Sequence, residues 1–279
     1  MTAIAPTLHL PERRSPLAGL APLATLARRR FQLTVRTPRE LAVPLLTPIM
    51  FALVIAPALK DALHASASYE SFVAIGTIGL LIPLNTMFAG LSVIVDREGG
   101  AQRELLAAPV PRALLVLANL VVALAVTALQ VGVLLVLARA RGIGLDVSAA
   151  GAGWFLSAAV LFTVGMYGAA ETLASRVPRQ EEYIARLPVI AIVPWFLAGS
   201  LFPIGALPLV LTWIARFLPL THALALMRYG LLGDSSGLHA IWRMSDPTAM
   251  AGLSLAVVAL FAAALTAVSI RVFTRAALR

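Results

Sequence analysis

The sequence predicts an all-α integral membrane protein with six transmembrane helices. Hydrophobic residues occupy 60% of the 279 positions, charged residues occupy only 13%, and the mean hydropathy is +0.91. A soluble globular protein of this size would need more polar surface. An apolar helix crosses the hydrocarbon with about 20 residues, and six charge-free stretches have roughly that length or more. These stretches cover residues 41–59, 71–95, 113–138, 147–170, 187–215 and 247–270.

Cysteine usage and charge exclude several classes of protein. The chain contains no Cys, which rules out disulfides, thiolate metal sites and a cysteine nucleophile. The formal net charge is +9, and 21 of the 22 basic residues are Arg. These arginines cluster beside the apolar stretches, which suits contact with lipid headgroups better than binding of nucleic acid. We therefore expect membrane lipid as a partner and no nucleic acid.

The N-terminal 40 residues are predicted to form a basic cytoplasmic tail. They hold seven Arg and two Glu, and an apolar run at residues 17–27 lies between an Arg pair and an Arg triplet. An Arg pair before an apolar run is also typical of a cleaved export signal, but the triplet that follows would oppose translocation. We expect residues 1–40 to contain a retained amphipathic helix at the membrane interface. Residues 41–279 then form a single domain of six transmembrane helices.

The first two spans contain residues that disturb helices. The first span, residues 41–59, carries three prolines. Neighbouring helices in a membrane can satisfy the carbonyl groups that proline leaves free, so this span is predicted to be kinked. The second span, residues 72–95, has Pro83, Asn85 and Thr86 near its middle.

A charged segment, residues 96–112, joins the second and third spans. It contains three acidic and three basic side chains, whereas uncharged runs of 25 and 26 residues flank it. Residues 101–108 favour a helix with charged side chains on one side and two leucines on another. Two glycines precede this helix, and Pro109 and Pro111 stop it. The pattern predicts a short amphipathic helix at the cytoplasmic surface or, on composition alone, a solvated turn with a few ion pairs.

Polar residues occur inside several spans. The third span, residues 113–138, and the fourth, residues 149–173, contain amides and hydroxyls. Such groups could line a substrate path, although hydrogen bonds between helices are their commoner role. Glu171, near the end of the fourth span, is expected at the cytoplasmic interface, and residues 175–186 form a second charged cytoplasmic loop. The candidates for a substrate path are Asn85, Thr86, Gln130 and Thr163.

An apolar segment divided by prolines follows the fifth span, residues 183–202. Its pieces are too short to cross a bilayer, so residues 203–232 are predicted to enter the outer leaflet and return as a re-entrant hairpin. The sixth span covers residues 248–270. With both termini in the cytoplasm, 16 basic residues lie inside and six outside, as the positive-inside bias requires.

The charged segment resembles part of a known family, the permease subunits of type-2 ATP-binding-cassette (ABC) exporters. Its order of acid, Arg, Glu, one residue and Gly, followed by Leu-Leu, Pro-Val and Arg, is similar to their cytoplasmic loop between spans two and three. Asp96 stands where Glu is usual, and Ala101 where Thr is usual. The resemblance implies that residues 96–112 contain a coupling helix that docks on a separate ATPase subunit. The implied contact residues are Glu98, Gly100, Arg103, Glu104, Leu105, Leu106, Pro109 and Arg112.

The proline-divided segment also resembles this family, whose members have two external half-helices before the last span. His222 stands where Tyr is usual, and Ala225 where an acidic residue is usual, which leaves any shared polar role there open. The N-terminal amphipathic helix has a counterpart in the family as well. The residues that carry the resemblance in the re-entrant segment are Gly199, Phe202, Pro203, Pro208, Pro219, Thr221 and Arg228.

The lysine content bears on the energy source. The sole lysine, Lys60, lies in the sequence KDALH, so the chain contains no G-x-x-x-x-G-K-[ST] phosphate loop. The resemblance therefore implies a permease that is not itself an enzyme and binds no cofactor, with ATP and Mg on a partner ATPase. Six spans are few for a transport path, so we also expect a second permease subunit, identical or homologous. The expected cargo is amphipathic or hydrophobic, such as a drug, a lipid or a glycan, and it leaves the cell.

Two other classes of membrane protein are less compatible with the sequence. An ion-coupled secondary transporter would need ionisable groups near the middle of the membrane, and the six charge-free stretches contain none. An intramembrane metalloprotease would need clustered histidines, but the four His residues are scattered and none belongs to an H-E-x-x-H motif.

Overall fold

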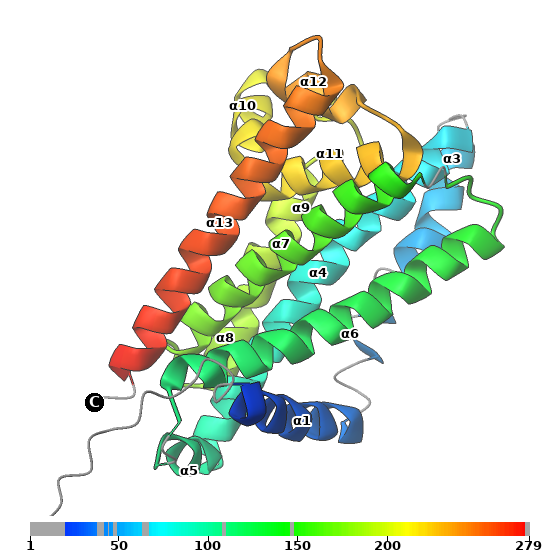
Figure 1. The fold of residues 1–279 in the computed structure, drawn as a ribbon. Coiled ribbons are helices and arrows are strands. Elements are labelled where there is room, and N and C mark those ends of the chain that lie inside the picture. Colours follow the sequence, from blue (N-terminus) through cyan, green and yellow to red (C-terminus); the bar gives the residue numbers. More distant parts are fainter. Residues whose placement is uncertain are drawn as a thin grey trace, which may run out of the picture.

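The computed structural model describes residues 20–37, 42–43, 45–46, 49–62, 67–107, 110–145 and 148–276, and these residues contain helices and no β-strand. Four helices are long and apolar enough to cross a membrane (Figure 1). They are α4 (Ala67–Glu98), α6 (Arg112–Ala140), α7 (Ala149–Ala174) and α13 (Pro247–Ala276). Helices are thereby confirmed at the second, third, fourth and sixth predicted spans.

The first and fifth predicted spans are not single long helices. In the first, a π-helix, η2 (Phe51–Ile55), leads into α3 (Ala56–Ala62), while Pro44 and Pro48 lie outside the described residues. In the fifth, α8 (Gln180–Leu187), a second π-helix, η3 (Pro188–Ile192), and α9 (Val193–Leu197) follow one another directly. Proline cannot donate the usual helical hydrogen bond, and a π turn lets the chain stay helical around it.

The predicted total of six spans is not established by helix length. Length and composition give four spans in the described residues, or five when one bent pair of helices is counted as a span. That pair consists of α10 (Leu209–Phe217) and α11 (Pro219–Leu232), which meet at 79°. Such a bend is what a re-entrant hairpin requires, and it agrees with the prediction for residues 203–232.

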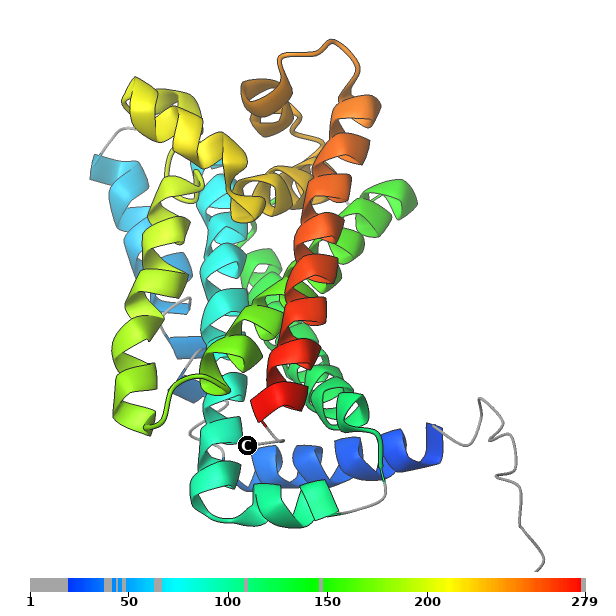
Figure 2. The ribbon, with the colours of Figure 1, turned by 90° about the vertical axis from the view of Figure 1, so that its left-hand side faces the viewer.

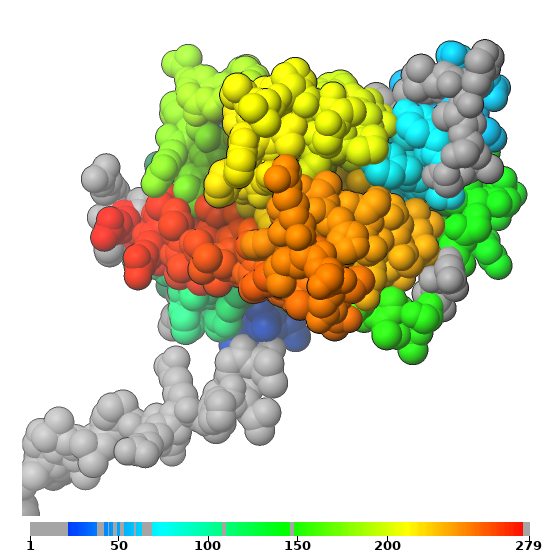
Figure 3. All heavy atoms as spheres, turned by 90° about the horizontal axis from the view of Figure 1, so that it is seen from above, coloured from blue at the N-terminus to red at the C-terminus, as the bar shows by residue number. Residues whose placement is uncertain are grey.

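Prolines begin each piece of the re-entrant segment. Pro203 precedes the 3₁₀ turn η4 (Ile204–Ala206), Pro208 precedes α10, and Pro219 is the first residue of α11. Proline suits these positions because the first N–H groups of a helix have no intrahelical acceptor. α11 is buried along almost its whole length, whereas α10 is largely exposed. Figure 3 looks down on this end, where α10 (yellow) and α12 (Ser236–Trp242, orange) cover the bundle.

The bundle has two distinct ends (Figures 1 and 2). α1 (Leu20–Arg36), α5 (Ala101–Ala107), α8 and the C-terminal part of α13 lie at one end, which we call the α5 end. α3, α10, α11 and α12 lie at the other, the α11 end. At the α11 end, Lys60 Nζ donates to Glu70 Oε1 at 2.9 Å, and this bond raises the pKa of Lys60.

At the α5 end, α1 is the predicted amphipathic helix, and residues 1–19 lie outside the described residues.

Helix α7 is the centre of the bundle, where it packs against α13, α11 and α4. Glycines bring α7 close to α13: a Cβ on Gly168 would lie 2.7 Å from the Leu265 backbone, and one on Gly165 would lie 2.5 Å from the Phe261 ring. Small residues are favoured at such crossings because close packing, rather than a hydrophobic driving force, holds helices together in lipid.

The contact between α7 and α11 is reciprocal. A Cβ on Gly151 would lie 2.2 Å from the Gly230 carbonyl oxygen, and a Cβ on Gly230 would lie 2.5 Å from the Gly151 carbonyl oxygen. Neither position can accept a side chain unless the two helices move apart.

We expect Gly151→Ala to destabilise the protein by about 1–3 kcal/mol, because the added methyl group overpacks a backbone contact. The measurement is the apparent melting temperature of the detergent-purified chain. Gly153→Ala is the matched control, since a Cβ there meets nothing within 4 Å and alanine favours the helix. Equal melting temperatures for the two variants would contradict the close crossing.

Candidate functional site

The base of α4 contains the first part of the predicted charged segment. α4 continues through Glu98, so Asp96, Arg97 and Glu98 are helical and extend the second predicted span, residues 72–95. Successive residues of an α-helix point about 100° apart. The three charged side chains therefore leave α4 in three different directions.

Asp96 pairs with Arg30 of α1. Arg30 Nη1 donates to Asp96 Oδ2 at 3.3 Å, and the two side chains are only 10% and 19% exposed. Of the predicted Arg triplet, Arg30 alone is buried, because it lies on the inner face of an amphipathic helix. The pair joins α1 to the base of α4.

Arg97 joins the base of α4 to the end of α7. Its Nη1 donates to Ala174 O at 3.0 Å, and its Nη2 donates to Val177 O at 2.6 Å and to Pro178 O at 3.1 Å. The last carbonyl groups of a helix have no intrahelical donor and carry the negative end of the helix dipole. The guanidinium group therefore stabilises the C-terminus of α7 and fixes the loop that leads to α8.

A tight turn separates α4 from α5. The Gly99 N–H donates to Val95 O at 2.9 Å, and the Gly100 N–H donates to Arg97 O at 3.2 Å. Gly100 has a φ of +81°, a left-handed conformation that glycine adopts without steric cost. The predicted short helix is present at residues 101–107; position 108 and Pro109 lie outside the described residues.

Part of the predicted contact set faces the protein itself. Leu105 and Leu106 are half-buried and pack against an apolar cluster whose buried members include Leu115, Leu120 and Phe273. Arg112, the first residue of α6, donates through Nη1 to Thr274 O at 3.2 Å. The two leucines help to hold α5 against the bundle, and their apolar contact with a partner stays a prediction.

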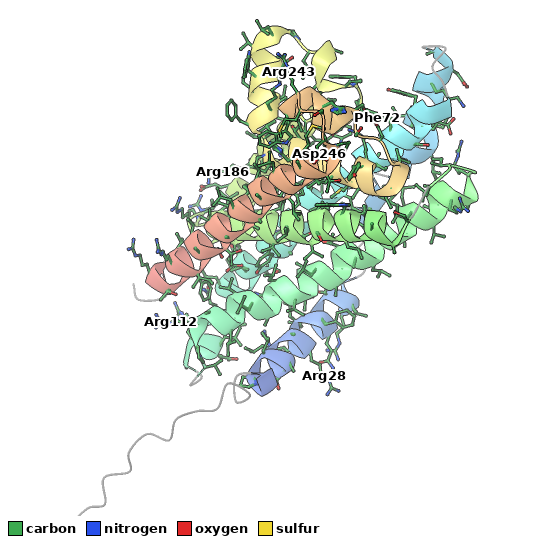
Figure 4. The ribbon with its side chains drawn as sticks, turned by 45° about the horizontal axis from the view of Figure 1, so that its top comes forward. Arg28, Phe72, Arg112, Arg186, Arg243 and Asp246 are labelled. Atoms are coloured by element: carbon green, nitrogen blue, oxygen red, sulfur yellow. The ribbon has the colours of Figure 1, made fainter. Side chains whose placement is uncertain are left out.

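The remaining charges of the segment face outward. The side chains of Glu98, Arg103 and Glu104 are exposed, and none of them forms a hydrogen bond or ion pair with any residue that the structure describes. We call these three side chains the α5 face. The loop fixed by Arg97 adds further exposed charges, Arg176, Arg179, Glu181 and Glu182. In Figure 4, Arg28 and Arg112 mark this end, while Arg243 and Asp246 mark the α11 end.

The four candidates for a substrate path do not converge on one cavity. Asn85 Nδ2 donates to Thr127 Oγ1 and to Ala123 O between α4 and α6. Thr86 and Thr163 donate to carbonyl groups of their own helices, and Gln130 is buried in α6. This placement favours the structural alternative, in which polar groups satisfy one another inside the bundle. A role in the substrate path stays a prediction.

Glu171 lies about one turn before the end of α7, which runs to Ala174. Its side chain is fully buried, and Tyr167 donates its hydroxyl to Glu171 Oε2 at 2.7 Å. Its position at the cytoplasmic interface stays a prediction.

The predicted residues of the re-entrant segment fall into two groups. Pro203, Pro208 and Pro219 shape the backbone, and Gly199, with a φ of +79°, turns the chain after α9. Thr221 and Arg228 are buried on α11, whereas Phe202 is exposed.

Sequence reasoning missed the roles of Arg30, Asp96 and Arg97 as connections between helices. The helical period of the Arg triplet contains a signal for Arg30, since only one of three consecutive residues can face inward on an amphipathic helix. For Arg97 no signal exists, because its acceptors are carbonyl groups that every residue carries.

The apolar helices, the bent pair and the short helix at the base of α4 define a multi-pass membrane protein with a short, charged cross-helix at one end. A family model described as ABC-2 type transporter matches residues 22–232, and the chain belongs to this family. It is the permease component of an ABC transporter, a component that lacks an ATPase site and works with an ATP-binding subunit. A comparison with curated proteins finds no match.

Proposed function

We propose that this chain is the transmembrane subunit of an ABC exporter and that the α5 face docks on the ATP-binding subunit. One observation carries the proposal: exposed charges without a partner among the described side chains lie on the short helix α5 and at the adjoining base of α4, and this base is bonded to α1 and to the end of α7. Charges without internal partners are available to orient a second protein. A rigid base lets a displacement of α5 reach several helices together.

Force would pass from the partner to the bundle through the base of α4. The turn at Gly100 is short and hydrogen-bonded, so α5 cannot move far without α4. Asp96 then carries the displacement to α1 and Arg97 carries it to α7. Leu105 and Leu106 set the orientation of α5, and Arg112 links the following helix to α13.

The apolar interior of the helix bundle supports an amphipathic or hydrophobic cargo, such as a drug, lipid or glycan. The described polar groups inside the bundle are mostly hydrogen-bonded within it, and an almost wholly apolar groove of about 240 Å³ runs between α4, α7, α11 and α13. Four or five spans are few for a transport path, so a second permease subunit, identical or homologous, is part of the proposal. ATP and Mg belong to the partner ATPase.

The test is purification of the chain from its native membrane with its partners attached. We expect an ABC-type ATPase to co-purify, and inside-out vesicles containing the complex to accumulate cargo when ATP is added. The chain freed of the ATPase should not hydrolyse ATP. ATP turnover by the isolated chain would contradict the proposal that a separate subunit hydrolyses ATP. Cargo uptake driven by an ion gradient without ATP would support the alternative function, an ion-coupled transporter.

Topology gives an independent prediction. The α5 end and both termini should face the cytoplasm, so single cysteines at Gly100 and Gln180 should resist an impermeant thiol reagent in intact cells. A cysteine at Ser236, at the α11 end, should react. The chain has no cysteine of its own, so every signal comes from the introduced residue. Reaction at positions 100 and 180 but not at 236 would invert the proposed orientation.

A further inference from the structure

A cavity of about 140 Å³ lies at the α11 end, between α4, α11, α12 and the turn that follows α9. Three of its lining residues, Thr221, Ala225 and Arg228, are spaced i, i+4 and i+7 and so share one face of α11. The small side chain of Ala225 leaves space between the two polar ones. Phe72 of α4 forms another wall, and Figure 4 shows it at this end of the molecule.

Arg228 is a buried cation without a carboxylate partner. Its side chain is 5% exposed, its guanidinium carbon lies 3.4 Å from the centroid of the Phe72 ring, and Nη2 donates to Phe72 O and Ser200 O at 3.1 and 3.2 Å. Nε and Nη1 donate to no residue that the structure describes, and no described carboxylate lies within 4.0 Å. Asp234 interacts with Arg228 at longer range, and its Oδ1 accepts the Ser236 N–H.

Thr221 is the second donor at the cavity. Its hydroxyl is buried and has no hydrogen-bond partner among the described residues. Buried polar groups are usually satisfied, and a buried charge is costly unless it is paired. If Arg228 only held α11 against α4, its role would account for the two hydrogen bonds of Nη2. Its Nε and Nη1 and the Thr221 hydroxyl would still have no acceptor among the described residues.

We propose that this cavity binds an oxyanion, a phosphate or a carboxylate, attached to an apolar body. Arg228 provides the charge and the N–H donors of Nε and Nη1, Thr221 provides a hydroxyl donor, and the remaining walls are mainly apolar. The anion has two sources, the headgroup of an anionic lipid or a soluble amphipathic anion. The site goes beyond the proposed function, because it needs neither nucleotide nor the ATPase.

The test uses the purified full chain without nucleotide or partner. Native mass spectrometry measures binding of phosphatidylglycerol against phosphatidylcholine with the same acyl chains, and inorganic phosphate and hexanoate are added as soluble competitors. We expect the wild type to prefer phosphatidylglycerol, and Arg228→Gln to weaken its binding by roughly tenfold or more. Arg228→Lys, which keeps the charge but loses the planar fork, should lie between.

A second variant keeps the test valid if Arg228→Gln fails to fold. Ala240→Leu fills the cavity from α12 and keeps every contact of Arg228, and it should abolish the preference for the anionic lipid. Ala256→Leu, on an exposed face of α13, is the matched control and should bind as the wild type does.

The competitors identify the source of the anion. Binding that phosphate or hexanoate displaces supports a soluble ligand, and binding that neither displaces supports a lipid headgroup. Equal binding of the two lipids by the wild type, together with no effect of phosphate or hexanoate on its melting temperature, would overturn the proposal. So would lipid binding that is unchanged in both Arg228→Gln and Ala240→Leu. Neither result bears on ATP-driven transport.

Discussion

Glu98→Arg is expected to lower ATP-driven transport by roughly 5- to 150-fold, the range of a typical coupling free energy of 1–3 kcal/mol, while the amount of protein in the membrane stays the same. Glu98 is exposed at the base of α4 and makes no ion pair or hydrogen bond with any described residue, so its reversal removes nothing that stabilises the chain. Its effect should therefore appear only where another protein contacts it. The measurements are recruitment of the ATPase and transport in vesicles.

The control for Glu98→Arg is Asp61→Arg, the same kind of charge reversal at an exposed acid of α3, at the opposite end of the bundle. It should leave recruitment and transport near wild-type levels. Leu105→Asp is unsuitable as a second test, because Leu105 packs inside the α5 end and its loss would disturb the fold. Wild-type recruitment and transport in Glu98→Arg would support the solvated-turn alternative and remove the docking assignment.

Arg97→Gln should have the second large effect, on stability and transport together. The substitution removes a cation that donates to Ala174, Val177 and Pro178, and leaves their carbonyl groups at the end of α7 without a donor. Hydrogen bonds from a charged group are worth about 1.5–3 kcal/mol each, with partial compensation from water at this end of the bundle. We expect a lower melting temperature and weaker coupling between ATP hydrolysis and transport.

Two variants separate the roles of Arg97. Arg97→Lys keeps the charge, but a lysine ammonium group lacks the planar fork with which arginine reaches three carbonyl groups. The melting temperature of this variant should therefore lie between those of the wild type and Arg97→Gln. Arg176→Gln removes an exposed guanidinium group of the adjoining loop that donates to no described residue, and it should change neither stability nor coupling. Equal melting temperatures for Arg97→Gln and Arg176→Gln would contradict the bracing role.

The parts of the fold that follow from local pattern could be predicted from the sequence. Uninterrupted apolar runs gave α4, α6, α7 and α13, and the prolines gave the bent pair of α10 and α11. The short helix α5 followed from its helix-forming residues between glycine and proline. The π turns η2 and η3 were not predictable, because whether a proline kinks a helix or widens one turn depends on which neighbours satisfy the freed carbonyl groups.

The candidate site was predictable in position but only partly in orientation. The sequence located the α5 face, yet it could not say that Leu105 and Leu106 are half-buried against the bundle, since that depends on how α5 packs on the apolar cluster around Leu115 and Phe273. Glu171 illustrates the same limit. The sequence does not show that its side chain is fully buried and accepts the hydroxyl of Tyr167, one turn earlier in α7. Burial of this kind is set by tertiary packing.

The acceptors of the bracing arginines have an evolutionary consequence. Arg97 donates to Ala174, Val177 and Pro178, and Arg112 donates to Thr274, in each case through the backbone carbonyl group. Every amino acid supplies that group, so the accepting positions are free to vary among relatives as long as the backbone keeps its course. Paired substitutions would not reveal these contacts. Unlike the Arg30–Asp96 pair, these connections at the base of the permease would leave their trace on the arginines alone.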